Sequence, residues 1–195
     1  MITVYGYAGE PSGQLRDAVA SAALVVGGQR HLDALAVPAH LRIVLGPIGP
    51  AVDALAALDP ALPAVVIASG DPLFYGVVRR LRTAGLKCRV VPTVTSLQLA
   101  FAAVALPWDD ALLASAHGND PAPALAACRV HPKVGLLTDP KVGLPQIVAA
   151  HPDAMLLVIG DAPKQALHAQ AQAPESIQAA AEDAVVDAPA EDDAK

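Results

Sequence analysis

A β-branched apolar run that ends abruptly in a glycine-containing turn is the feature that most constrains the fold of this chain. The run at residues 65–68 (VVIA) leads into Ser69-Gly70-Asp71-Pro72, and the letters LFYG follow at 73–76. A short continuous apolar run predicts a strand buried on both faces, as in the parallel sheets of α/β proteins. Such sheets bind ligands beyond the carboxyl ends of their strands, and this turn offers backbone N–H groups, one carboxylate and little side-chain bulk. The sequence therefore predicts a ligand-facing turn here; the structural alternative is that Asp71 caps a helix beginning near Leu73.

Short β-rich runs alternate with alanine-rich helical stretches along the rest of the chain, which predicts an α/β fold. Expected strands cover residues 2–5, 23–26, 42–45, 65–68, 87–91, 111–115, 134–138 and 155–159. Expected helices cover residues 14–21, 51–58, 96–104 and 145–150, and Thr95 or Ser96 would cap the third of these. The segment 6–11 (GYAGEP) would be the ligand-facing loop of the first strand.

Composition shifts divide the expected fold into two domains. Near Pro107 the sequence turns to Trp-Asp-Asp, which indicates a boundary between domains at 1–107 and 108–162. The second domain would extend to 186 if residues 176–186 form a helix. Residues 187–195 are expected to be a solvated acidic tail.

Composition also excludes several classes of protein. With 54% hydrophobic and 16% charged residues the chain can bury a core, yet no apolar run approaches the roughly 18 residues that span a bilayer. No basic segment followed by an apolar stretch and a cleavage site marks a signal peptide, so we expect a cytoplasmic protein that does not bind membranes. Cys88 and Cys128 are far apart without neighbouring metal ligands, and we interpret both as core residues rather than as a disulfide or a metal site.

The charge balance argues against a nucleic-acid partner. The net charge is −6, and the 13 Lys and Arg residues are thinly spread. One local basic group contains Arg79, Arg80 and Arg82, with Lys87 and Arg89 beyond it. We interpret it as the exposed face of a helix; the alternative is a site for the carboxylates of an acidic substrate, which guanidinium groups bind well.

Four segments resemble one known family in the right order. Residues 25–32 (VVGGQRHL) resemble its V-V-G-G-x-R-H-L segment, and residues 68–76 match its A-S-G-D-P-L-F-Y-G signature throughout. Residues 91–101 (VPTVTSLQLAF) are similar to V-P-G-V-S-S-x-Q-L-A-F, and residues 106–110 with His117-Gly118 continue the pattern. On these residues the segment 1–150 resembles the tetrapyrrole methylases, and within them the precorrin-6Y methyltransferases, specifically the carbon 5 methylating half of the cobalt-precorrin-7 type.

The resemblance implies two α/β domains with a cofactor cleft between them, and against the family pattern the second domain is abbreviated. It also implies S-adenosylmethionine as methyl donor, no metal and a precorrin as substrate. It further implies a homodimer, and a separate carbon 15 methyltransferase and decarboxylase is a candidate partner because that domain of the fused relatives is absent. The implied cofactor contacts are Gly9, Gly70, Asp71, Phe74, Thr95, Ser96, Leu137 and Thr138.

Three residues are candidates for the chemistry of methyl transfer. Asp71 would balance the sulfonium charge, Tyr75 would position the substrate, and His117 would accept a proton after the carbon is methylated. Each has a structural alternative: a helix cap, a packing contact and a loop hydrogen bond, respectively. His31 lies in an expected loop after Gly27-Gly28 that would border the substrate.

Departures from the family leave alternatives open. The first loop (GYAGEP) lacks the typical G-x-G-P-G, and Thr93 replaces a glycine, which strains the backbone if φ there is positive. The unfamiliar sequence after residue 160 favours a non-catalytic binding or partner-stabilising relative as one alternative. Methylation of a protein or RNA by a superfamily member is another, against which the acidic composition counts.

Overall fold

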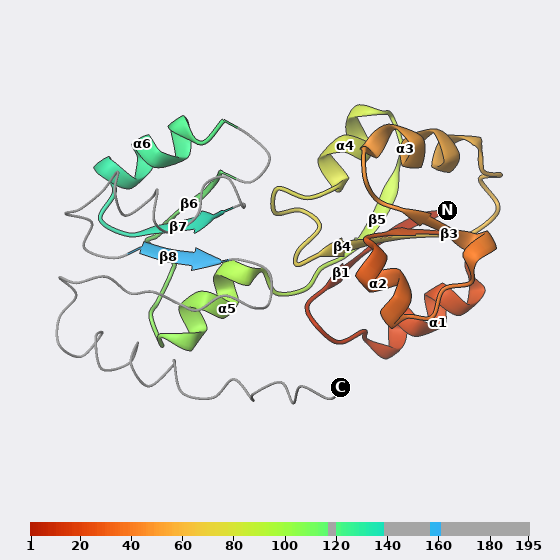
Figure 1. The fold of residues 1–195 in the computed structure, drawn as a ribbon, viewed down its shortest axis with the longest axis horizontal. Helices are drawn as coiled ribbons and strands as arrows, with labels where there is room; N and C mark the ends of the chain where they lie inside the picture. The colour runs from red at the N-terminus through yellow and green to blue at the C-terminus, as the bar shows by residue number, and fades with distance from the viewer. Residues whose placement is uncertain (117–119, 139–156, 161–195) are drawn as a thin grey trace, which may run out of the picture. The chain divides into compact units, whose positions relative to one another are not determined.

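The computed structural model describes residues 1–116 and 120–138, and the backbone of residues 157–160. The chain divides into two compact units, the first at Met1–Thr95 and the second beginning at Ser96. The expected helices at 145–150 and 176–186 and the acidic tail lie outside the described residues. Each unit is an α/β sandwich of its own (Figure 1).

The first unit is built on a five-stranded parallel sheet with the order β3-β2-β4-β1-β5. Its strands are β1 (Ile2–Tyr7), β2 (Leu24–Gly27), β3 (Arg42–Val44), β4 (Ala64–Ser69) and β5 (Cys88–Val91). The central strand is β4, and its Val66 pairs with Val4 on one side and Val26 on the other. All three side chains are fully buried, so the apolar run that dominates the sequence is the buried strand that we predicted.

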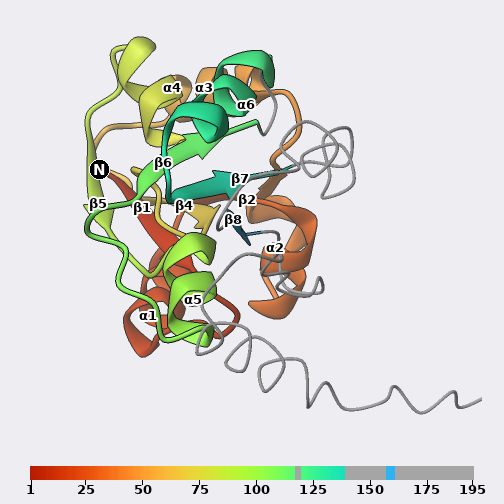
Figure 2. The ribbon, with the colours of Figure 1, turned by 90° about the vertical axis from the view of Figure 1, so that its left-hand side faces the viewer.

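Helices cover both faces of this sheet. They are α1 (Gly13–Ser21), α2 (Gln29–Ala34), α3 (Ile48–Ala57) and α4 (Val78–Thr83), with a 3₁₀ turn at Ala39–Leu41. Alternation along the strands sends Tyr5 and Val65 toward α1 and α2, whereas Val4 and Val66 pack against α3 and α4. Figures 1 and 2 show the two helix pairs on opposite sides of the strands.

The connections between the strands define the topological switch point of this sheet. Strand β1 leads to α1 on one face, whereas its neighbour β4 leads to α4 on the other face. Neighbouring parallel strands whose connections leave toward opposite faces form a topological switch point, and open α/β sheets bind their ligands just beyond it. The loops after β1 and β4 are therefore the expected ligand loops, in agreement with the sequence pattern.

The second unit contains a three-stranded parallel sheet with the order β6-β7-β8. Its elements are α5 (Ser96–Ala103), β6 (Leu112–Ser115), α6 (Ala122–Val130), β7 (Val134–Leu137) and β8 (Leu157–Gly160). Leu136 packs with α6 on one face of the sheet. On the other face α5 comes so close to Gly135 that a Cβ there would lie 3.1 Å from Phe101 and 3.2 Å from Leu97.

The compact units divide at Thr95, whereas composition indicates a boundary near Pro107; helix α5 packs on β7 and β8 of the second unit. The structure corrects two other expectations. The helix expected from about Leu73 begins only at Val78. His31 lies in helix α2 rather than in a loop.

Candidate functional site

The loops after β1 and β4 are joined at the switch point. The amide of Gly70 donates to the carbonyl oxygen of Tyr7 at 2.8 Å, which extends the contact between the two strands beyond their parallel pairing. Gly70 has φ +63, a left-handed conformation that glycine adopts without strain. A Cβ at Gly6 would lie 2.8 Å from the Gly70 oxygen and 2.6 Å from Cγ2 of Thr93, so the backbones meet too closely for any other residue at position 6.

Asp71 organises the turn after β4 without capping a helix. Its Oδ1 accepts a hydrogen bond from the Leu73 amide at 2.7 Å, and its carbonyl oxygen accepts one from the Phe74 amide at 3.1 Å. This is an Asx turn, in which the carboxylate holds its own loop. The alternative in which Asp71 caps a helix beginning near Leu73 is therefore wrong, since α4 begins at Val78.

The remainder of the turn is compact and strained. Tyr75 has φ +53, which is unusual for a bulky residue, and its ring meets that of Phe74 edge-on at 5.0 Å. A Cβ at Gly76 would lie only 2.3 Å from the Pro72 carbonyl oxygen. Both features belong to a non-helical turn, and α4 begins only after it, at Val78. Backbone strain of this kind is found preferentially at functional sites.

Exposed apolar side chains also lie along the carboxyl edge of the first sheet, from one outer strand to the other. Val44 ends β3, Leu73 and Tyr75 follow β4, and Val94 follows β5; between 43% and 63% of each side chain's surface is exposed. Each of these residues comes at or after the carboxyl end of a parallel strand. The edge therefore offers apolar surface as well as backbone polar groups, which is the usual composition of a small-molecule site.

A second group of side chains, which the sequence analysis did not bring together, lies at the same edge. The Arg30 Nε donates to His31 Nε2 at 3.1 Å, and Arg30 Nη2 donates to Ser69 Oγ at 3.1 Å. Ser69 Oγ is also 3.3 Å from His31 Nε2, and the Tyr7 ring lies 4.7 Å from the His31 ring. Tyr7 and Ser69 end β1 and β4, and Arg30 follows β2, so three neighbouring strands contribute. We call Tyr7, Arg30, His31 and Ser69 the Arg30 cluster.

His31 is the buried base of this cluster, with only 3% of its surface exposed. Burial, and then the nearby Arg30 charge, lower the pKa of His31 below its ordinary value. The imidazole is therefore neutral at pH 7, and since its Nε2 accepts from Arg30, its proton resides on Nδ1. Among the described residues Nδ1 has no hydrogen-bond partner.

The structure brings together some of the predicted site residues and leaves others apart. Gly70, Asp71, Phe74 and Tyr75 share one turn. Gly9, with φ +97, lies in the loop after β1, and the space where its Cβ would be is open. The remaining predicted residues are Thr95 at the end of the first unit, Ser96, Leu137 and Thr138 in the second unit, and His117, which lies outside the described residues.

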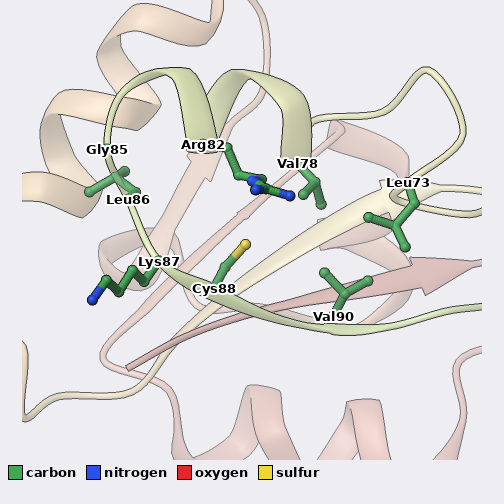
Figure 3. Close-up of a pocket in the computed structure, with 8 residues that line it drawn as sticks. All are labelled: Leu73, Val78, Arg82, Gly85, Leu86, Lys87, Cys88 and Val90. Atoms are coloured by element: carbon green, nitrogen blue, oxygen red, sulfur yellow. The ribbon is translucent and has the colours of Figure 1, made fainter.

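The basic group of the sequence analysis lies elsewhere, on α4 and β5. Arg79 and Arg80 are exposed, as expected of a solvated helix face. Arg82 and Lys87 line a groove of about 350 Å³ whose walls are mainly apolar (Figure 3). The groove is lined by Leu73, Val78, Arg82, Gly85, Leu86, Lys87, Cys88 and Val90. Burial raises the pKa of the Cys88 thiol, so this cysteine is an unreactive wall residue at neutral pH.

Nothing in the part of the chain that the structure describes gathers three or more residues of the types that bind metals. Within the same residues, no helix is both long enough and apolar enough to cross a membrane.

Comparison with known proteins agrees with this fold. A profile of the tetrapyrrole (corrin/porphyrin) methylases matches residues 14–154. A cobalt-precorrin-7 C(5)-methyltransferase from Salmonella typhimurium is 33% identical over 153 residues, which are 74% of each chain. A precorrin-6Y C(5,15)-methyltransferase (decarboxylating) from a Sinorhizobium species is 35% identical over 124 residues, or 62% of this chain and 29% of that longer relative.

A solved structure supports the fold independently. The cobalamin biosynthesis precorrin-6Y methylase from Archaeoglobus fulgidus superposes with a TM-score of 0.51 at 21% identity, over 62% of this chain and 67% of that one. The α/β architecture and the profile match define an α/β methyltransferase. The chain belongs to the tetrapyrrole (corrin/porphyrin) methylases. The predictions of this family, of an α/β fold and of a methyltransferase are confirmed.

Proposed function

We propose that this chain uses S-adenosylmethionine to methylate carbon 5 of a precorrin in cobalamin biosynthesis. The observation that carries the proposal is the junction of the β1 and β4 loops at the switch point, where Gly70 bonds to Tyr7. The β4 loop contains the signature residues by which the chain resembles carbon 5 methyltransferases. A relative at 33% identity bears the name of that activity, and the match covers 74% of both chains.

The residues of the β1 and β4 loops fit such a cofactor. Gly9 leaves open the space that a side chain would fill, and Gly70 exposes backbone at a left-handed turn. A neighbouring carboxylate, Asp71, is half-buried and fixed by its Asx turn. Exposed apolar groups at Leu73 and Tyr75 supply surface for packing. The carboxylate suits the positive centre of such a ligand, the exposed backbone suits its polar groups, and the apolar surface suits its aromatic base.

S-adenosylmethionine supplies an electrophilic methyl group attached to a positively charged sulfur. The contribution of this chain is to align the macrocycle with that methyl group and to exclude water, and alignment is worth on the order of 7–11 kcal/mol in favourable cases. Asp71 would stabilise the positive charge of the bound donor, and Tyr75 would position the macrocycle. The nucleophile is an electron-rich carbon, so a strong general base is not required.

Other expectations remain predictions from the resemblance. They are cofactor contacts at Phe74, Thr95, Ser96, Leu137 and Thr138, a proton-accepting role of His117, a homodimer, a cytoplasmic location and a separate carbon 15 enzyme as partner.

Calorimetric titration with S-adenosylmethionine and S-adenosylhomocysteine tests the proposal. The two ligands differ in the charge on sulfur, so their ratio isolates the electrostatic role of Asp71. Asp71→Asn retains an oxygen for the Leu73 amide but removes the charge, and should weaken binding of the sulfonium ligand more than binding of the thioether. Asp71→Ala also removes the Asx turn and should weaken both.

Asp59 offers a matched control, because its Oδ1 accepts from the Ala61 amide at 2.8 Å in a turn that precedes β4. Asp59→Ala removes a comparable bond at the opposite end of the sheet and should leave both affinities unchanged. Micromolar binding followed by methyl transfer to the precorrin supports the proposal. A folded chain that binds neither ligand at millimolar concentration would overturn it in favour of a non-catalytic relative.

A further inference from the structure

The Arg30 cluster has a charge that the described part of the protein leaves unneutralised. The ion pairs among the described residues are Arg42 with Asp33 and Lys133 with Asp110, and neither includes Arg30. The hydrogen-bond acceptors of Arg30 are an imidazole nitrogen and a hydroxyl oxygen, which are both neutral. The guanidinium therefore keeps its full positive charge at an exposed position beside the switch point.

The guanidinium is also held in a fixed orientation. The bonds to His31 Nε2 and Ser69 Oγ occupy one edge of its plane, the edge formed by Nε and Nη2. His31 is buried and lies against the Tyr7 ring, so the acceptors belong to the packed body of the unit. An arginine that is oriented in advance loses little side-chain entropy when it binds a ligand.

The two bonds leave the end-on edge of the guanidinium, formed by Nη1 and Nη2, directed away from its anchors. Two parallel N–H groups at this edge match the two oxygens of a carboxylate, the geometry in which arginine binds carboxylates most strongly. The chemistry that fits the site is therefore a carboxylate. It could belong to the rim of the tetrapyrrole or to the amino-acid part of the methyl donor.

We propose that Arg30, fixed by His31 and Ser69, binds a carboxylate arm on the periphery of the tetrapyrrole substrate and so selects its orientation. This inference rests on the proposed function. The periphery is favoured over the donor because Arg30 reaches its anchor Ser69 from α2, which follows β2, and β2 lies on the side of β4 away from β1 and so to one side of the switch point. Arg30 is a specificity-determining residue on this account, and His31 and Ser69 are positioning residues.

The test compares a corrin polycarboxylate, cobyrinic acid, with its fully methylated ester, which has the same ring without the charges. Binding of both to the full chain is measured by calorimetry, alongside S-adenosylhomocysteine. Arg30→Gln should weaken binding of the acid roughly tenfold or more, because it removes a charge-assisted hydrogen-bonded pair. Binding of the ester and of S-adenosylhomocysteine should remain within about twofold of wild type.

Two further variants make the result interpretable. Ser69→Ala keeps the charge of Arg30 but removes one of the two bonds that orient the guanidinium. It should weaken binding of the acid less than Arg30→Gln does and leave binding of the ester unchanged. It also provides the test if Arg30→Gln does not fold. Arg80→Gln removes the same charge from an exposed position on α4 and should bind both corrins like wild type.

Each alternative result overturns the inference. If Arg30→Gln loses affinity for the acid and the ester equally, Arg30 acts only by maintaining the structure. If Arg80→Gln loses as much affinity for the acid as Arg30→Gln does, the effect is one of general electrostatics. A loss confined to S-adenosylhomocysteine would assign the carboxylate to the methyl donor. Failure of the proposed function is separate, since a wild-type chain without affinity for S-adenosylhomocysteine would show it before any Arg30 variant is compared.

Discussion

The amide of Gly70 lies 2.8 Å from the carbonyl oxygen of Tyr7 and donates a hydrogen bond to it, so the last residue of β1 holds the first residue after β4. This bond fixes the start of the signature turn relative to the loop of the first strand. The same two strands deliver Tyr7 and Ser69 to the Arg30 cluster. Packing at the strand ends therefore determines the geometry of both parts of the site.

Gly76 is the position at which this turn tolerates substitution least. Gly76→Ala would place a Cβ 2.3 Å from the Pro72 carbonyl oxygen. The Cβ position is fixed by the backbone of residue 76 and the oxygen belongs to the backbone of Pro72, so the turn must open. We expect the free energy of unfolding to fall by about 2 kcal/mol or more and the affinity for S-adenosylhomocysteine to fall with it, measured by urea denaturation and calorimetry.

Gly13 is the matched control for that substitution, because it is the first residue of helix α1 and the space at its Cβ position is open. Gly13→Ala should stabilise the protein by up to about 1 kcal/mol through helix propensity and leave ligand affinity unchanged. Equal stability of the wild type and Gly76→Ala would contradict the close approach of Gly76 to Pro72.

Thr93 replaces a family glycine, and the structure shows that the replacement is not strained at its own backbone. The described residues with positive φ outside glycine are Ala36, Tyr75 and Ala105, so Thr93 adopts an ordinary conformation. Its methyl group instead fills the space beside Gly6.

Gly6→Ala should therefore destabilise the protein by about 1–3 kcal/mol, and adding Thr93→Gly should recover only part of the loss. The second substitution removes the contact with Cγ2 but leaves the Gly70 oxygen at 2.8 Å and the Thr93 nitrogen at 2.9 Å from the new Cβ. A double-mutant cycle in urea measures the recovery. Complete recovery would show that the backbone contacts do not matter.

The elements predictable from sequence are those with a local signal. The buried strand β4 was evident from an uninterrupted apolar run. Helix α1 was expected at residues 14–21, and in the structure the side chain of Ser12 caps it, at 3.2 Å from the Leu15 amide. Helix α2 was not predicted because Gly27-Gly28 indicates a loop, and the helix that follows has only six residues. Its stability comes from burying Leu32 in the core, a tertiary effect.

The site was predictable only in part for the same reason. Glycine and the Asp-Pro turn indicated the ligand loop, but the late start of α4 accompanies the φ of Tyr75 and the contact of Gly76 with Pro72. The pairing of Arg30 with Ser69 joins residues 39 positions apart. No local pattern encodes such a contact; the R-H pair of the VVGGQRHL segment was the available signal.

His31 predicts a specific dependence of stability on pH. Its pKa is lowered in the folded protein, so below about pH 6.5 the unfolded chain binds a proton that the folded chain resists. The folded protein therefore has its full stability above that pH, and it loses stability as the pH falls toward the pKa of His31 in the folded state. We expect the free energy of unfolding of the wild type to decrease between pH 7 and pH 5 more steeply than that of His31→Gln, which cannot titrate.

Urea denaturation of both proteins across this pH range provides the measurement, and taking the difference removes the contribution of every other titrating group. Identical slopes would indicate that His31 is protonated freely in the folded state, in conflict with its burial beside Arg30.

The second unit offers a test of its own packing at Gly135 in β7. A Cβ there would lie 2.9 Å from Leu113, 3.1 Å from Phe101 and 3.2 Å from Leu97, and the residues nearest to it from α5 are buried. Gly135→Ala should cost about 1–3 kcal/mol by forcing α5 away from the sheet. Adding Leu113→Ala removes the nearest side chain, so the double variant should lose less stability than the sum of the losses in the two single variants. Thermal denaturation of the single and double variants measures both effects, and a Gly135→Ala protein as stable as wild type would show that α5 does not pack this closely on β7.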